Sequence, residues 1–181
     1  MKLISLLEKL EYTCLQGSTD QEVKNVIYDS RKVEEGSLFI CIRGAVVDGH
    51  KFVPDVVAKG AKVLIVEEAV EAPEDVTVIL VKDTRYAMAF ISAAYFGYPA
   101  EKLKTIGITG TKGKTTTTYM VKSILENAGY KVGLIGTIEA IIGDKVIPAK
   151  NTTPESYVIQ EYFHEMAEAG CDCVVMEVSS Q

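Results

Sequence analysis

Short blocks of apolar residues alternate with polar turns along this chain and predict strands and helices in succession. In the first half, runs rich in β-branched and aromatic residues predict strands at 23–28, 37–42, 62–66 and 76–81. Apolar residues at helical spacing predict helices at 3–10, 52–59 and 84–96. Residues 1–98 are therefore expected to form a small N-terminal domain of mixed α/β structure.

A break at Gly97, Tyr98 and Pro99 separates this pattern from a second one, because proline cannot continue a helix. Beyond it, strands are predicted from 104, at 131–136 and at 172–178, a hairpin at 138–147, and helices at 115–128 and 154–169. This alternation favours a mainly parallel sheet with ligands at the carboxyl ends of its strands. The sequence stops directly after a predicted strand, so residues 99–181 are expected to form a truncated α/β domain.

The stretch 105–118, T-I-G-I-T-G-T-K-G-K-T-T-T-T, joins a predicted strand to a predicted helix through a glycine-containing loop. This order is typical of the phosphate-binding loop (P-loop) of nucleotide triphosphatases, in which backbone N–H groups and a helix N-terminus face anionic oxygens. Lys114 would reach the terminal phosphates, and the hydroxyl of Thr115 would bind Mg²⁺. The residues expected to contact the nucleotide are Gly110, Thr111, Lys112, Gly113, Lys114, Thr115 and Thr116.

The spacing of this loop departs from the general pattern, which would place a glycine at the position of Ile108. The alternative is a glycine turn at a helix N-cap, followed by a threonine-rich first turn. The apolar strand before the loop and the amphipathic helix after it favour the phosphate-binding interpretation.

Glu177 follows an apolar run at the end of the last predicted strand. A carboxylate in that place is costly unless it is paired or bound to a cation, and P-loop enzymes use a carboxylate at a nearby strand end to hold Mg²⁺. The alternative is a glutamate that points to solvent at the edge of the sheet. The apolar character of the strand favours the metal ligand.

Two further polar segments leave their role open when only their residues are considered. Asn151-Thr152-Thr153-Pro154 could bind an anionic or sugar-bearing ligand, or could be an N-cap followed by proline in a first helical turn. Asp29-Ser30-Arg31 could belong to a site, or could be a turn after a strand in which Ser30 caps and Arg31 is solvated.

Composition narrows the class of protein. The 181 residues are 48% hydrophobic and 24% charged, with a net charge of −6, so a globular protein is expected and a nucleic-acid footprint is not. No run is long and apolar enough for a membrane span, and no signal peptide is seen. The four cysteines have no C-x-x-C spacing and are expected to be free thiols in the cytoplasm. His50 and His164 are expected to be structural or surface groups, since neither has a carboxylate or thiol at ligand spacing.

Together these motifs resemble the Mur ligase family. G-T-K-G-K-T-T-T is similar to the ATP loop of that family, and the segments from Asp29 to Phe39 and from Asp48 to Phe52 are similar to its uridine-nucleotide domain. N-T-T-P-E from Asn151 and M-E-V-S-S from Met176 resemble the MurE type. The resemblance covers all 181 residues, with its motifs in the expected order.

The resemblance implies a function. ATP would phosphorylate the D-Glu carboxylate of UDP-MurNAc-L-Ala-D-Glu, and a diamino acid, meso-diaminopimelate or L-lysine, would then attack the acyl phosphate. It implies a substrate-binding domain at 1–98 and the first part of a P-loop ATPase domain at 99–181, in a cytoplasmic monomer. The roles it implies are catalysis for Lys114, Mg²⁺ binding for Thr115 and Glu177, and substrate binding for Ser30, Asn151, Thr152, Thr153 and Ser179.

Two departures limit what the resemblance implies. Gln181 stands where many relatives have histidine, which puts a metal role for that residue in doubt. The rest of the ATPase domain and a third domain are absent, so ligation by this chain alone is not expected. The alternatives are a non-catalytic module that binds a nucleotide sugar, and a related ligase of the MurF or folylpolyglutamate kind, against which Asn151-Thr152-Thr153-Pro154 argues.

Overall fold

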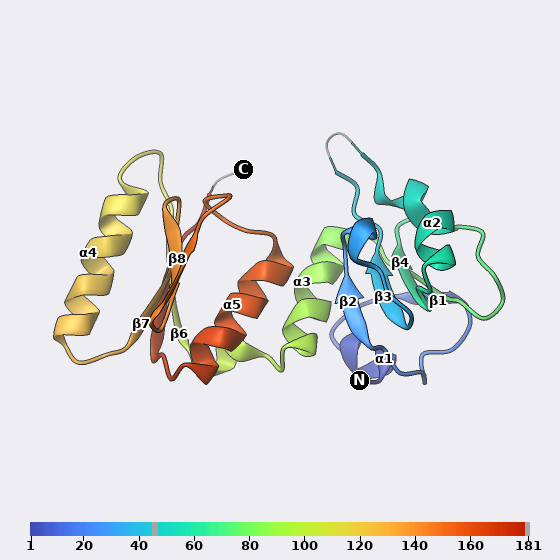
Figure 1. Ribbon diagram of the computed structural model, residues 1–181, viewed down its shortest axis with the longest axis horizontal. Helices are drawn as coiled ribbons and strands as arrows, with labels where there is room; N and C mark the ends of the chain where they lie inside the picture. Colours follow the sequence, from blue (N-terminus) through green and yellow to red (C-terminus); the bar gives the residue numbers. More distant parts are fainter. Residues whose placement is uncertain (45–46, 180–181) are drawn as a thin grey trace. The chain divides into compact units, whose positions relative to one another are not determined.

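The computed structural model describes residues 1–44 and 47–179, which divide into two compact units. Unit 1 comprises Met1–Tyr95 and unit 2 comprises Phe96–Gln181 (Figure 1). The division lies a few residues before the boundary expected near Pro99. Each unit has a sheet of its own.

Unit 1 is built on a five-stranded sheet with the order β1-β5-β4-β3-β2. Its strands are β1 (Thr13–Gln16), β2 (Asn25–Ile27), β3 (Ser37–Ile40), β4 (Val63–Val66) and β5 (Thr77–Leu80). Strands β2 to β5 are parallel, and β1 pairs antiparallel with β5 through an irregular register. The carboxyl ends of the four parallel strands therefore lie along one edge.

The helices of unit 1 follow the strands as the alternating pattern predicts. They are α1 (Leu3–Leu6), the 3₁₀ turns η1 (Ser30–Lys32) and η2 (Gly49–Phe52), α2 (Val53–Ala58) and α3 (Thr84–Tyr95). Helix α2 ends before Gly60, whose φ of +102° is accessible to glycine at little cost.

The core of unit 1 is explained by the period of two along its strands. Phe39, Leu64 and Val78 point to the face that packs with Val53 and Val56 of α2. The neighbouring positions Leu38, Ile65 and Ile79 point to the opposite face and are also fully buried. Both faces are apolar, as is usual for parallel strands covered on two sides.

Unit 2 has a second five-stranded sheet, with the order β6-β10-β7-β8-β9. Its strands are β6 (Lys104–Ile108), β7 (Val132–Ile135), β8 (Glu139–Ile142), β9 (Lys145–Pro148) and β10 (Cys173–Glu177). β6, β10 and β7 are parallel, while β8 and β9 form the predicted antiparallel hairpin. Strand β10 thus lies between β6 and β7, the first two strands of unit 2.

Two helices cover the two faces of this sheet (Figure 1). Helix α4 (Lys114–Asn127) packs on the face of Cys173 and Val175, and α5 (Ser156–Glu168) packs on the face of Val174. A further 3₁₀ turn, η3 (Pro99–Lys102), precedes β6. The predicted fold class, mixed α/β with mostly parallel sheets, is therefore confirmed.

The structure differs from the predicted elements in three details. The opening helix was predicted over 3–10 but ends at Leu6, and the chain turns at Leu10 before β1. Strand β1 itself was not predicted, because its residues are mostly exposed and carry no apolar face. Pro154 was expected to begin the last helix, which starts at Ser156. Across the described residues, the helices are all too short or too polar to cross a membrane.

Candidate functional site

Three strand ends meet at one edge of the second sheet. Glu177 at the end of β10 is in register with Ile108 at the end of β6, and Met176 is in register with Ile135 at the end of β7. Because these strands are parallel, the segments that follow them emerge side by side. The loop 109–113 follows β6, and Gly136-Thr137 follows β7.

The loop 109–113 leads into α4 through backbone conformations that favour glycine. Gly113 is the N-cap of α4, with φ +78°, and Gly110 has φ +147°. Because Gly113 has no side chain, it cannot cap the first turn, whose N–H groups remain directed out of the helix. An anion at this helix N-terminus would meet both these donors and the positive end of the helix dipole.

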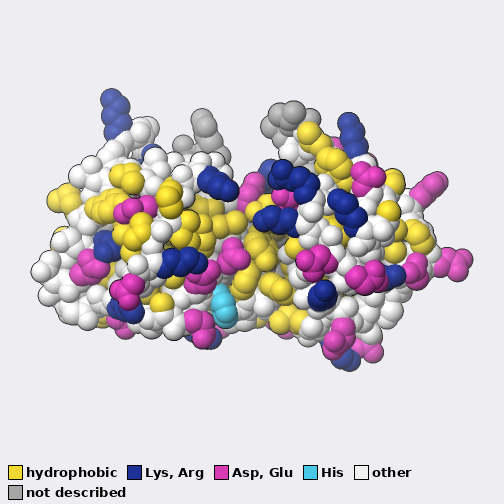
Figure 2. All heavy atoms as spheres, viewed as in Figure 1, with side chains coloured by type: hydrophobic (Ala, Val, Ile, Leu, Met, Phe, Trp, Pro, Cys, Tyr) yellow, Lys and Arg dark blue, Asp and Glu magenta, His cyan; other side chains and the backbone are white. Residues whose placement is uncertain are grey.

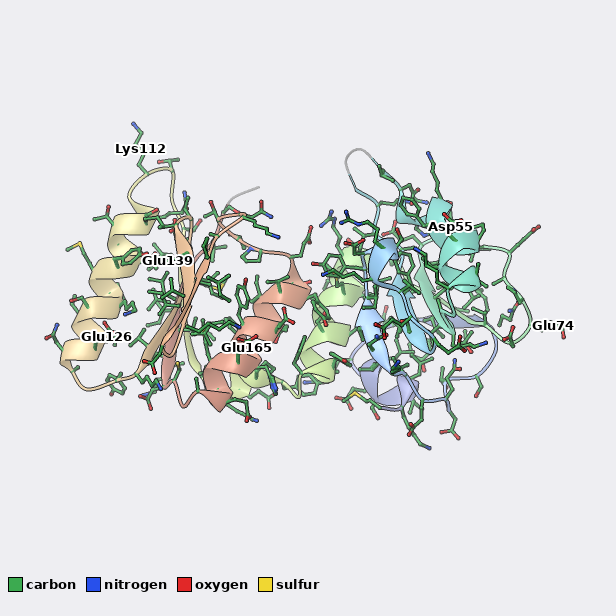
Figure 3. All side chains as sticks on the ribbon, in the orientation of Figure 1. Asp55, Glu74, Lys112, Glu126, Glu139 and Glu165 are labelled. Atoms are coloured by element: carbon green, nitrogen blue, oxygen red, sulfur yellow. The ribbon has the colours of Figure 1, made fainter. Side chains whose placement is uncertain are left out.

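The ammonium group of Lys114 lies across the loop, where Nζ donates a hydrogen bond of 2.7 Å to the carbonyl oxygen of Gly110. Thr111, Lys112 and Thr116 are exposed, and Lys112 points into solvent from the tip of the loop (Figure 3). The structure thus gathers the predicted P-loop residues around one helix N-terminus.

Glu177 is the acidic centre of the site and only 1% of its surface is exposed. Its Oε2 accepts hydrogen bonds from the hydroxyls of Thr115, at 3.0 Å, and Thr137, at 3.1 Å. Its Oε1 accepts a bond of 2.9 Å from the backbone N–H of Thr137. The alternative of a solvent-facing glutamate is therefore wrong, and the predicted neighbours Thr115 and Glu177 are in direct contact.

Gly136 allows the carboxylate to lie against the backbone. A Cβ atom at this position would be 2.6 Å from Oε1 of Glu177, closer than non-bonded atoms approach. The side chain of Glu177 thus occupies the space that any other residue at 136 would fill.

The donor set of this site fits Mg²⁺. A carboxylate and a hydroxyl are the hard oxygen ligands that Mg²⁺ prefers, and Mg²⁺ usually completes its shell with phosphate oxygens and water. The groups that hold Glu177 are uncharged hydroxyls and an amide, so its negative charge is available to a cation. Within 1–44 and 47–179 no cluster of three or more acidic, histidine or cysteine side chains could hold a metal ion.

The segment after β9 meets the same strand end through its threonines. Thr152 Oγ1 shares a hydrogen bond of 3.1 Å with Thr137 Oγ1. Thr153 Oγ1 donates to the backbone carbonyl of Glu177, at 3.0 Å, and accepts from the backbone N–H of Ser179, at 2.9 Å. Asn151 is exposed beside them.

These contacts exclude the N-cap interpretation of this segment. Helix α5 has Glu155 as its N-cap, and that cap makes no side-chain hydrogen bond. Thr153 instead attaches the segment to the end of β10, and Thr152 attaches it to Thr137, which follows β7. Gln181, whose metal role was in doubt, lies outside the described residues.

A second acidic group lies close to the site. The hydroxyl of Tyr119, on α4, donates a bond of 2.8 Å to Glu139, on β8. Burial, Glu139 and the more distant Glu177 raise the pKa of Tyr119 to about 12, so its phenol stays protonated at neutral pH. This bond connects α4 to β8 of the β8–β9 hairpin; Glu139 is labelled in Figure 3.

Ser30, in unit 1, borders a cavity of about 480 Å³ at the carboxyl ends of β2 and β3. The aromatic residues on its wall are Tyr28, Phe39 and Phe52. Asp29, rather than Ser30, caps η1, and Arg31 donates two bonds to the Asp29 carboxylate, at 2.9 and 2.7 Å. These bonds lower the pKa of Asp29 to about 2.

His50 is a buried structural group, as predicted, but the reason given for that prediction was wrong. A carboxylate does lie beside it, since Nδ1 is 2.6 Å from Oδ1 of Asp48. Nε2 accepts a bond of 2.9 Å from the backbone N–H of Glu67, so the ring proton is on Nδ1. The His50 amide, donating to Asp48, is the main cause of a lowered pKa for that aspartate.

A second cavity and the cysteines lie apart from the predicted site residues. A cavity of about 630 Å³ near Lys9, Lys82 and Tyr86 contains none of the predicted site residues. The four cysteines are free, as predicted, and burial raises the pKa of Cys41 to about 12. Acidic and basic side chains are interspersed on the face seen in Figure 2.

Two family models match the chain. One, described as the catalytic domain of the Mur ligase family, matches residues 22–96, and the other, described as the Mur ligase middle domain, matches residues 108–181. The chain belongs to the Mur ligase family. The matched ranges contain the Ser30 cavity and the P-loop site, respectively.

Relatives with curated names are similar over almost the whole chain. A UDP-N-acetylmuramoyl-L-alanyl-D-glutamate–2,6-diaminopimelate ligase from Clostridium perfringens (strain 13 / Type A) is 53% identical over 180 residues. One with the same name from Clostridium tetani (strain Massachusetts / E88) is 49% identical over 183 residues. The alignments cover 99% of this chain but only 37% and 38% of these relatives, so the chain spans well under half of their length.

Solved structures share the fold. A structure of a ligase with that same name has a TM-score of 0.76 and 22% identity, over 99% of this chain and 36% of the other. The MurF ligase of Thermotoga maritima, solved in complex with ADP, has a TM-score of 0.55 and 22% identity, over 87% of this chain and 32% of the other.

The sequence did not predict Gly136 and Thr137 as part of the site. Both follow a fully buried strand, β7, and therefore emerge at the edge where Glu177 lies. The argument from strand ends that selected Glu177 would have selected them too. Sequence alone could not show that β10 is inserted between β6 and β7.

Proposed function

We propose that this chain is part of an ATP-dependent ligase that forms an amide bond in peptidoglycan precursor synthesis. An oxygen of the D-Glu carboxylate of UDP-MurNAc-L-Ala-D-Glu attacks the γ-phosphorus of ATP, and ADP leaves. The amine of a diamino acid then attacks the acyl carbon, phosphate leaves, and the amine loses a proton. The observation that carries this proposal is the 3.0 Å contact between Thr115 and Glu177 beside the glycine-capped N-terminus of α4.

The nucleotide would bind at the loop 109–113 and the first turn of α4. Lys114 would exchange the Gly110 carbonyl for phosphate oxygens and stabilise the charge of the transferring phosphoryl group. Thr115 and Glu177 would hold Mg²⁺, which offsets the negative charge of the phosphates. The family resemblance and the ADP bound to a MurF ligase of the same fold support this assignment.

The residues proposed to bind the UDP-muramoyl substrate form two sets. The cavity beside Ser30 has aromatic walls and a hydroxyl, which suit a uridine nucleotide. Asn151, Thr152, Thr153 and Ser179 would hold the muramoyl part, because they lie within one hydrogen-bond network at the end of β10 or directly beside it.

Among diamino acids, 2,6-diaminopimelate is the proposed substrate in preference to L-lysine. The relatives that are 53% and 49% identical are both named as ligases for that amino acid. A product assay with a longer chain that contains these residues tests this choice. Incorporation of D-Ala-D-Ala instead would make the protein a MurF-type ligase.

Binding to the 181-residue chain tests the proposal directly. Calorimetry is expected to detect UDP-MurNAc-L-Ala-D-Glu, with competition by UDP, and a non-hydrolysable ATP analogue whose affinity depends on Mg²⁺. Lys114→Ala is expected to weaken the analogue about tenfold or more, since it removes a charged phosphate contact. Lys122→Ala, which removes a lysine of the same helix that pairs with Glu126, is the matched control. Absence of heat with both ligands would contradict the proposed function.

A further inference from the structure

Thr137 is the one described side chain that contacts both the Glu177 carboxylate and the 151–153 segment through its hydroxyl. It follows β7 by two residues and belongs neither to the loop 109–113 nor to the 151–153 segment. Thr115, Glu177, Thr137 and Thr152 form a continuous chain of contacts of 3.0, 3.1 and 3.1 Å. This chain runs from the P-loop helix to the segment proposed to bind the muramoyl group.

The direction of the hydrogen bonds in this chain follows from the chemistry of its groups. An ionised carboxylate only accepts, whereas a hydroxyl has one proton to donate. The proton of Thr137 therefore points to Glu177, and the hydroxyl of Thr152 donates to Thr137. As a result, the Thr152 oxygen faces its surroundings as an acceptor.

A cation at Thr115 and Glu177 would change this chain at its first member. The Thr115 hydroxyl now donates to the same carboxylate oxygen, Oε2, as Thr137 does. If the Thr115 oxygen binds a cation, its proton must turn away, and the cation draws charge from the carboxylate. The hydrogen bond from Thr137 to Glu177 then weakens. The hydrogen bond between Thr152 and Thr137 changes as a result, and with it the ability of the Thr152 oxygen to accept a hydrogen bond from a ligand.

We propose that Thr137 is a positioning residue that couples occupancy of the Thr115–Glu177 cation site to binding of the muramoyl peptide at Asn151–Thr153. This inference rests on the proposed function and adds a residue that the sequence and the comparisons do not assign. Coupling of this kind is reciprocal, so each ligand changes the affinity of the other by the same factor.

The coupling factor is the quantity to measure. The affinity of the 181-residue chain for UDP-MurNAc-L-Ala-D-Glu is determined by calorimetry, with and without saturating Mg²⁺ and a non-hydrolysable ATP analogue. The wild-type ratio is expected to differ from one by about fivefold or more, a usual size for such coupling. In Thr137→Val, which keeps the backbone N–H bond to Glu177 and loses the hydroxyl, the ratio is expected to fall to within about twofold of one.

Three further variants distinguish a positioning role of Thr137 from an effect on the stability of the fold. Thr137→Ser restores the hydroxyl and is expected to restore the coupling. Thr105→Val, at an exposed threonine of β6, is the matched control and is expected to leave the coupling unchanged. Thr152→Val breaks the same chain at its other end and is expected to abolish the coupling, and it replaces Thr137→Val if that variant does not fold.

The outcomes are distinct. If both ligands bind Thr137→Val with the wild-type coupling factor, the role of Thr137 is overturned and the proposed function stands. The same conclusion follows if both ligands bind the wild-type chain without coupling. If neither ligand binds the wild-type chain, the proposed function fails and the coupling fails with it. Loss of coupling in Thr137→Val together with its recovery in Thr137→Ser is the result that supports the inference.

Discussion

At the scale of single residues, Glu177 combines almost complete burial with a negative charge whose hydrogen-bond donors are all neutral. Burying a charge in such surroundings is unfavourable, and a bound cation would offset the cost. The residue is therefore placed for ligand binding at some expense to the stability of the empty protein.

Glu177→Gln tests this balance. The amide can accept from the Thr137 N–H and donate to the two hydroxyls, so the free energy of unfolding is expected to change by less than about 1 kcal/mol. The Mg²⁺ dependence of nucleotide binding is expected to disappear, because the charge is lost. Urea unfolding and calorimetry with the ATP analogue measure the two effects. Retained Mg²⁺ dependence in this variant would show that the cation does not use Glu177.

Asp29 gives a prediction for pH. Its pKa is about 2 in the folded chain, lowered mainly by the Arg31 side chain, against an ordinary value of 3.8. The pair therefore stabilises the fold fully above pH 3.8, and this contribution is lost as the pH falls towards 2. Arg31 is 86% exposed, so solvent screening limits the contribution to under about 1 kcal/mol.

Urea unfolding of wild-type protein and Asp29→Asn across this range measures the contribution. The difference in unfolding free energy is expected at pH 6 and to shrink towards zero near pH 2. A difference that grows on acidification would have the wrong sign and would rule out the ion pair as its source.

Single residues also show what sequence could and could not predict about the site. Lys114, Thr115 and Glu177 were predicted because motif and strand position both select them. Thr137 has no motif around it, and its importance comes from two contacts made by residues far apart in the chain. The contact between Asp48 and His50 was not predicted, because a search for metal-ligand spacing does not detect an internal hydrogen bond.

At the scale of elements, the packing of β7 against α5 depends on a missing side chain. A Cβ atom at Gly133 would overlap the sulfur of Met166, which is fully buried on α5. Gly133→Ala is therefore expected to destabilise the chain by about 1–3 kcal/mol through overpacking.

Met166→Ala in the same chain should relieve part of that cost. Alone, it leaves a cavity and is expected to cost about 2–5 kcal/mol, whereas the added methyl group of Gly133→Ala fills some of the same space. Urea unfolding of the two single variants and the double variant measures this coupling. Strictly additive costs would mean that the two side chains do not share the space.

The elements themselves were largely predictable. Buried strands such as β4 and β10 have continuous apolar runs, and α3 and α5 have clear helical periodicity. Strand β1 has neither signal, since it is held by pairing with β5 rather than by burial of its side chains. Helix α1 ends after one turn because its buried residues lie within Leu3–Leu7, and the polar Glu8 and Lys9 bury nothing further.

At the scale of the whole molecule, each unit has its own sheet and its own core. Residues 1–95, produced alone, are therefore expected to unfold in one cooperative transition and to retain the affinity of the 181-residue chain for UDP. Circular dichroism in urea and calorimetry with UDP test these two expectations. A non-cooperative transition would show that unit 1 is not an independent folding unit.

The fold class followed from the alternation of strands and helices, but the strand order of unit 2 did not. Periodicity reports which residues are buried and does not report which strands are neighbours. The site depends on that order, because β10 brings Glu177 to Thr115, which lies 62 positions earlier in the sequence.

The place of β10 between β6 and β7 has a consequence for the synthesis of this protein. A ribosome synthesises the loop 109–113 and β7 before β10, and until β10 is made the position between β6 and β7 is not filled by its own strand. A chain arrested before Cys173 would contain the loop 109–113 and Thr115 but would lack the carboxylate of Glu177. Binding of Mg²⁺ through Glu177 would therefore begin only after β10 has emerged from the ribosome and paired with β6 and β7.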